Sequence, residues 1–95
     1  MNDADLMGMR ARFVEFRRMS DLNAFDEGFI GMVLDAVDDA LDAIRDDTAD
    51  VPNPFGVTPL KRVLAMLLGA ALAVDDAQLQ VLANAERKRF VDEGG

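Results

Sequence analysis

The longest apolar stretch of the chain lies in residues 58–74, where no polar side chain occurs between Arg62 and Asp75. Thr58 is a favourable N-cap and Pro59 suits the first helical position, so the stretch predicts a helix over 58–74. A helix that is apolar all round must be covered on every side, in a core or in a membrane. This helix is shorter than the about 20 apolar residues that cross a bilayer. We therefore expect it to be the central, fully apolar helix of a protein core.

Apolar residues also recur at helical spacing in residues 3–19, where Leu6, Met9, Phe13 and Phe16 form one stripe. A stripe of this kind is typical of a helix that packs one face against a core. The alternative is a helix whose Met and Phe side chains anchor in a groove of a partner protein. Both readings predict a helix over 3–19.

A third pattern predicts a helix over residues 24–46. Gly28 and Gly31 are unfavourable inside it, because a helical Gly costs up to about 1 kcal/mol relative to Ala. We therefore expect either the close approach of another helix at these glycines or a helix start nearer Phe29. The predicted inward face consists of Phe25, Phe29, Met32 or Val33, Ala36 or Val37, Ala40 or Leu41, and Ile44.

The last predicted helix spans residues 75–92. Asp75 is expected to cap it, and Gln78 to complete a capping box by reaching back to the cap N–H. The basic cluster at residues 86–89 lies where cations suit the helix dipole, and it is too small for a nucleic-acid patch. The predicted inner face consists of Leu79, Leu82, Ala83 and Phe90.

Residues 47–57 form the one long connection. Pro52 and Pro54 exclude a helix interior, and Gly56 permits a sharp turn. We expect Phe55 to enter the core as a plug. The acids near this connection do not match the spacing of a calcium-binding loop.

Together these patterns predict an all-α fold, a small four-helix bundle that forms one domain over residues 1–95. Asn2 or Asp3 is expected to cap the first helix, and Asn23 the second. No stretch alternates apolar and polar residues for long enough to predict a strand.

The chain contains no His, Cys, Trp or Tyr. The absence of Cys excludes disulfides and thiolate metal sites, and the absence of His removes the commonest general base. We therefore expect a non-enzymatic protein with no cofactor and no bound metal. The first residues lack the basic-then-apolar layout of a signal peptide, which favours a location in the cytoplasm or within a virus particle.

The net charge of −8 is concentrated in residues 21–50, which carry ten acidic residues against Arg45 alone. Such a segment repels nucleic acid and favours a basic protein surface as partner. Within it, five acids follow the outward side of the predicted 24–46 helix and are here called the acidic row. It is interpreted either as a solubilising face or as a docking strip for a basic partner. The acidic row consists of Asp35, Asp38, Asp39, Asp42 and Asp46.

Small residues recur at Ala65, Gly69 and Ala73, four positions apart on the apolar helix. A row of small residues lets a second helix approach closely, so it is the predicted self-association surface. A short chain with so much apolar surface is expected to form a homodimer or a larger homo-oligomer.

The function expected from these features is that of an interaction or assembly protein, a structural, adaptor or chaperone-like subunit of cellular or viral origin. The alternative is an acidic inhibitor that occupies a basic nucleic-acid-binding surface of another protein. A metal enzyme would require ligand pairs such as Asp38 with Asp42 or Asp46 with Asp50, and a row of acids does not converge like a metal site. Direct nucleic-acid binding and a membrane partner are not expected.

Overall fold

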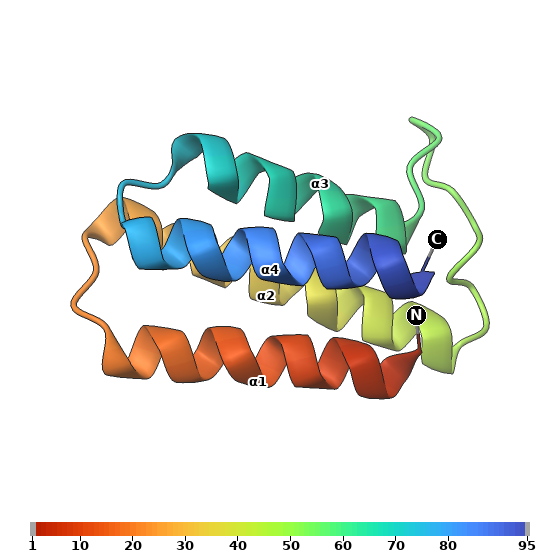
Figure 1. Cartoon of the computed structure of the whole chain (residues 1–95). Coiled ribbons are helices and arrows are strands. Elements are labelled where there is room, and N and C mark those ends of the chain that lie inside the picture. Colours follow the sequence, from red (N-terminus) through yellow and green to blue (C-terminus); the bar gives the residue numbers. More distant parts are fainter. Residues whose placement is uncertain (1, 95) are drawn as a thin grey trace.

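The computed structural model describes residues 2–94 and contains four helices and, over that range, no strand. The helices are α1 (Asp3–Met19), α2 (Ala24–Arg45), α3 (Pro59–Ala73) and α4 (Ala77–Gly94). Consecutive helices run antiparallel and form a ring in which α1 packs on α2, α2 on α3 and α3 on α4 (Figure 1). The ring closes with a slighter contact between α1 and α4. The predicted all-α four-helix bundle is confirmed, and each helix boundary falls within two residues of its expected position.

Three of the helix starts follow the predicted capping chemistry. The side chains of Asn2, Asn23 and Thr58 each accept a hydrogen bond from the backbone N–H three residues further on, at 3.0, 2.8 and 3.2 Å. Pro59 follows Thr58 at the first helical position. Each cap satisfies a backbone donor that has no partner inside the helix, which fixes where the helix begins.

The start of α4 differs from the prediction. Asp76, and not Asp75, caps the helix by accepting a hydrogen bond from the N–H of Leu79 at 2.9 Å. The side chain of Gln80 donates to the carbonyl of Val74 at 2.8 Å, so the amide that braces this turn is not Gln78. The turn is therefore one residue longer than expected.

One cluster of buried side chains draws on all four helices. The predicted core residues Leu6, Met9 and Phe13 of α1 are fully buried, and Phe16 is half-buried at the edge of the cluster. In α4, Leu79, Ala83 and Phe90 are buried as predicted. The largest contributions from α2 and α3 come from Ile30, Val33, Leu34, Val37, Val63 and Leu67.

The expectation that α3 is covered on every side is wrong for a single chain. In this ring α3 contacts α2 and α4 but not α1, so its outer side faces solvent. Leu68 is 45% exposed and Leu72 is 90% exposed. Among the described residues, none of the four helices combines the length and the apolarity that crossing a membrane requires.

Two expectations about the first turns of α2 are also wrong. Phe25, predicted to face inward, is 59% exposed, because the next residue, Asp26, is the one that turns into the protein. Neither predicted reason for Gly28 and Gly31 holds. A Cβ atom at either position would meet nothing within 4 Å, and α2 begins at Ala24, before both glycines.

Phe55 does not plug the core; it is 90% exposed at the tip of the 47–57 connection. The side chain of Asn53 accepts hydrogen bonds from the N–H groups of Phe55 (2.8 Å) and Val57 (3.1 Å). Gly56 supplies the positive φ of 78° that closes this turn. The turn is therefore held by its own backbone contacts and presents Phe55 to solvent.

Asp26 links the start of α2 to the turn between α3 and α4. Its side chain is 1% exposed and accepts hydrogen bonds from the N–H groups of Asp75 (3.2 Å) and Asp76 (2.9 Å). These two N–H groups precede α4 and have no helical partner of their own. One carboxylate thus fixes the position of the α3–α4 turn against α2.

Replacing this carboxylate should destabilise the fold. Asp26→Ala is expected to lower the free energy of unfolding by about 2–4 kcal/mol, because it leaves two partly buried N–H donors without acceptors. Urea denaturation followed by circular dichroism measures the change. The control is Glu27→Ala, an exposed acid one residue on, which should stay within about 0.5 kcal/mol of the parent. Equal effects of the two substitutions would contradict the role assigned to Asp26.

Candidate protein-interaction surface

No described residues form a group of three or more His, Cys, Asp or Glu side chains that could hold a metal ion. The ligand pairs considered from the sequence, Asp38 with Asp42 and Asp46 with Asp50, therefore do not belong to a converging site. Two of the carboxylates that the structure describes are buried, and both Asp26 and Glu86 accept hydrogen bonds from donors of the chain itself. The surface of the bundle is therefore where a functional site has to be sought.

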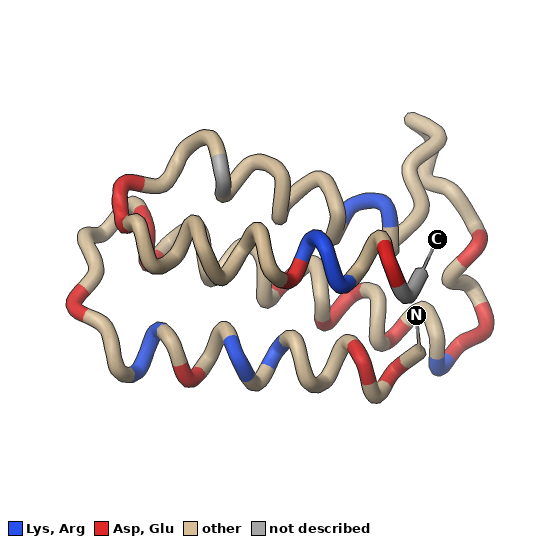
Figure 2. Tube along the Cα trace, in the orientation of Figure 1, with Lys and Arg blue, Asp and Glu red and all other residues tan. Residues whose placement is uncertain are grey.

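The acidic row lies along the outer side of α2, as predicted. Asp35, Asp39, Asp42 and Asp46 are exposed and Asp38 is half-buried. Acidic residues gather on the C-terminal half of α2 and the connection that follows it, whereas basic residues lie mainly on α1, at the start of α3 and towards the end of α4 (Figure 2). The bundle therefore has one strongly acidic edge.

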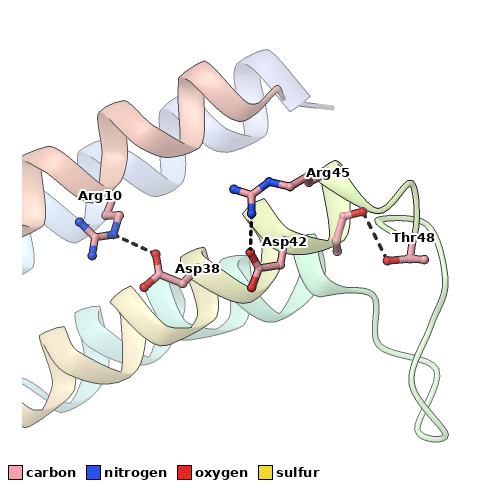
Figure 3. Close-up of polar contacts among 6 residues, drawn as sticks. Arg10, Asp38, Asp42, Arg45 and Thr48 are labelled. Atoms are coloured by element: carbon pink, nitrogen blue, oxygen red, sulfur yellow. Dashed lines mark hydrogen bonds and ion pairs between the residues drawn. The ribbon is translucent and has the colours of Figure 1, made fainter.

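Three members of the acidic row pair with arginines of the same chain. Asp38 accepts from Arg10 of α1 at 2.8 Å, and Asp42 is 3.5 Å from Arg45 on its own helix (Figure 3).

Asp39 pairs with Arg62 of α3 at 2.5 Å. These pairs are exposed, and each contributes about 1 kcal/mol or less to stability. Asp35 and Asp46 make no ion pair with any residue between 2 and 94. The row is thus partly neutralised within the chain, and its two remaining carboxylates are available to a partner.

The same exposed row of α2 is apolar in its N-terminal half. Phe25, Gly28 and Met32 are exposed at the helical spacing that continues into Asp35 and Asp39. The sequence prediction missed this continuity, because it assigned Phe25 to the inward face and left Met32 or Val33 open for the next turn. Gly28, which has no side chain to bury, was the available signal that this side of α2 is not packed in the core.

A second exposed row runs along α3 and consists of Lys61, Ala65, Leu68 and Leu72. It lies on the side of α3 that neither α2 nor α4 covers. Only its first residue is charged, so the row is basic at one end and apolar over the remaining turns.

The two exposed rows flank one seam between α2 and α3. Phe29 lies in this seam, where its ring comes within 3.3 Å of the position that a Cβ on Gly69 would occupy. The ring centroids of Phe25 and Phe29 are 6.5 Å apart, and the Asp39–Arg62 pair closes the other end of the seam. The two exposed rows together with this seam are called the α2–α3 face below.

The small residues predicted to mediate self-association lie on this face. Ala65 and Ala73 are exposed, and Gly69 is half-buried beneath Phe29. Gly69 is therefore already used inside the chain, because a side chain there would collide with the Phe29 ring. Ala65 and Ala73 are the members that a second chain can still approach.

A different hollow lies between α1 and α4, where the ring of helices is least tightly closed. This groove of about 620 Å³ is lined mainly by apolar atoms, and Glu15 lies at its edge. Glu15 pairs with Arg18 at 2.8 Å, and by accepting this hydrogen bond it raises the pKa of Arg18 above its ordinary value. The lining residues are Ala11, Arg12, Glu15, Phe16, Met19, Ser20 and Leu82.

Arg12 and Glu86 join α1 to α4 beside this groove. Glu86 is 1% exposed and receives two hydrogen bonds from the Arg12 guanidinium, that from Nη2 at 3.0 Å. In the sequence Glu86 was grouped with the basic cluster at residues 86–89, and only the packing of α1 against α4 reveals that it is buried. Gly8 makes room for the pair, since a Cβ there would lie 3.2 Å from the Arg12 side chain.

No protein-family model, curated protein or solved structure matches this chain.

The Arg12–Glu86 pair can be tested against an exposed pair of the same helix. Arg12→Met should lower the free energy of unfolding by about 2–4 kcal/mol, because Glu86 would remain buried without its cation. This figure is below that of a fully buried pair because Arg12 is 37% exposed. Arg10→Met, which breaks the exposed pair with Asp38, should cost about 1 kcal/mol or less.

The double variant Arg12→Met/Glu86→Leu should recover a large part of the loss, because no buried charge is then left unpaired. Chemical denaturation of the four proteins completes the comparison. An Arg12→Met protein as stable as Arg10→Met would show that the buried pair does not hold α1 to α4.

Proposed function

We propose that this protein is a non-enzymatic assembly subunit that self-associates through the α2–α3 face and presents the acidic row to a basic partner. It would act as a structural, adaptor or chaperone-like subunit in the cytoplasm or within a virus particle. The observation that carries the proposal is the exposed apolar surface of α2 and α3, with Phe25, Met32, Leu68 and Leu72 all open to solvent.

The energy available from covering this surface supports self-association. Burial of one Leu or Phe side chain is worth about 1.5–3 kcal/mol. Leu72, at 90% exposed, gains nothing from folding of the single chain. Contiguous apolar patches on soluble proteins commonly mark protein–protein contacts.

The chemistry of the chain supports a binding role over catalysis. The chain contains no His or Cys, so proton transfer or nucleophilic attack would depend on its acids, hydroxyls and lysines. Its buried carboxylates bind backbone N–H groups or Arg12, which is the pattern of structural groups.

The mass of the protein in solution tests self-association. Light scattering at a series of concentrations should show a dimer or a larger species at both low and high salt, because apolar burial is insensitive to screening. Leu72→Gln should raise the dissociation constant at least about a hundredfold, because each copy of a dimer loses one buried Leu side chain. Val81→Gln removes an exposed apolar side chain from α4 instead and should leave the mass unchanged. A monomer at every concentration would reject the proposal.

The exposed acids support the second candidate, an inhibitor of a basic nucleic-acid-binding surface. Asp35→Asn/Asp42→Asn/Asp46→Asn should weaken binding to a basic protein target at low salt, with the effect diminishing as salt rises. The control is Asp3→Asn/Asp21→Asn/Asp50→Asn, which removes the same charge outside the row. Equal binding by both triple variants would mean that the row has no specific role.

A further inference from the structure

The spacing of contacts along α2 and α3 determines which residues of the two exposed rows are level with one another. The helices run antiparallel (Figure 1), and the Phe29 ring lies over Gly69. Both helices rise about 1.5 Å per residue, so each step along α2 matches a step back along α3. Leu72 is therefore level with the turn that contains Gly28. Lys61 is level with the space between Asp35 and Asp39.

The same levels place large residues of one row beside small residues of the other. On α3 the protruding side chains are Leu68 and Leu72, and Leu72 lies within one helical turn of the level of Gly28 on the α2 row. A Cβ at Gly28 would meet nothing within 4 Å, so the space above this residue is open.

The converse holds for the large side chains of α2. Phe25 is level with Ala73, and Met32 is level with Ala65. Phe25, Met32 and Leu72 therefore each lie close to the level of a small residue on the other helix.

The charges of the two rows are complementary in the same way. The C-terminal half of the α2 row is acidic, and the residue of the α3 row at this level is Lys61. Neither Asp35 nor Lys61 makes an ion pair with any described residue. Each therefore retains a charge that a partner of opposite sign can neutralise.

We propose that the occupant of the α2–α3 face is a second copy of this chain, related by a two-fold axis that runs parallel to the helices. In this arrangement α2 of each copy lies over α3 of the other, and the four helices at the interface form an antiparallel bundle. Leu72 of one copy packs over Gly28 of its partner, and Lys61 meets the partner's Asp35. This arrangement rests on the self-association proposed above.

The other face-to-face symmetry fits the surface poorly. A two-fold axis that lies in the interface and perpendicular to the helices would place α2 of one copy on α2 of the other. The acidic half of the α2 row of one copy would then lie over the apolar half of the same row in its partner. Carboxylates would then lose water without gaining a partner of opposite charge. The axis parallel to the helices instead places large side chains opposite small ones, and Lys61 opposite Asp35.

The area required is also available. A standard interface removes about 800 Å² from each partner. The accessible surface of the chain is 5751 Å², and the bundle is 37 Å long and 21 to 26 Å across. One lateral face of such a bundle is large enough to supply this area.

Cysteine mapping tests the arrangement, because the chain contains no Cys of its own. Gly28→Cys and Leu72→Cys proteins of different tag length are mixed and oxidised gently. The mixture should give mainly the mixed disulfide, since these positions face one another across the interface. Met32→Cys with Ala65→Cys is the second pair, and it leaves Leu72 intact. Phe55→Cys with Leu72→Cys is the control and should give no preference for the mixed product.

The outcomes separate the arrangement from the function on which it rests. A wild-type dimer in which Gly28→Cys links mainly to itself places α2 on α2 and overturns the arrangement, while self-association stands. A dimer in which neither pair gives the mixed disulfide overturns it as well. A wild-type monomer at all concentrations rejects both the arrangement and the proposed function.

Charge exchange provides an independent test. Lys61→Glu should raise the dissociation constant about tenfold at low salt, because it creates two repulsive contacts per dimer. Adding Asp35→Lys to this variant should restore the constant to within about threefold of the parent. Adding Asp21→Lys makes the same change in net charge outside the face and should restore nothing. Equal restoration by the two lysines would overturn the proposed contact.

Discussion

Each helix in a ring of four helices packs against only two neighbours, and this constraint leaves part of the apolar surface of the protein uncovered. Helix α3 carries no polar side chain between Arg62 and Asp75, yet it contacts only α2 and α4. Its third side, with Leu68 and Leu72, is left in water because no further helix is available. The apolar half of the outer α2 row lies beside it. The exposed α2–α3 face is thus a direct consequence of building a small bundle from a helix that is apolar all round.

Two buried carboxylates link parts of the ring that are far apart in the sequence. Asp26 binds the turn before α4 to the first turn of α2, and Glu86 binds Arg12 across the loosest contact in the ring. A buried acid requires donors aimed at it, so each of these residues accepts only one arrangement of the neighbouring helices. The polar links therefore fix how the helices are placed, while the apolar cluster supplies most of the stability.

The acidic row and the apolar row of α2 are two halves of one exposed strip. In the sequence they looked like separate features, a charged outer side and an inward apolar side. Phe25 and Met32 belong to the outer side because the inward positions of these turns are taken by Asp26, Ile30 and Val33. The protein thereby joins an apolar contact surface to a charged one, a combination that lets association be both stable and selective.

The four helices, their limits and three of their caps followed from the sequence, because apolar spacing and N-caps such as Asn23 and Thr58 act within a few residues. The core positions of α1 and α4 followed as well. The exposure of Phe25, Leu72 and Phe55, the burial of Asp26 and Glu86, and the contact of Phe29 with Gly69 did not. These depend on which helices become neighbours, and residues as distant as Arg12 and Glu86 are brought together only by that packing. Local chemistry determined the helices of this protein, and the arrangement of those helices decided its surface.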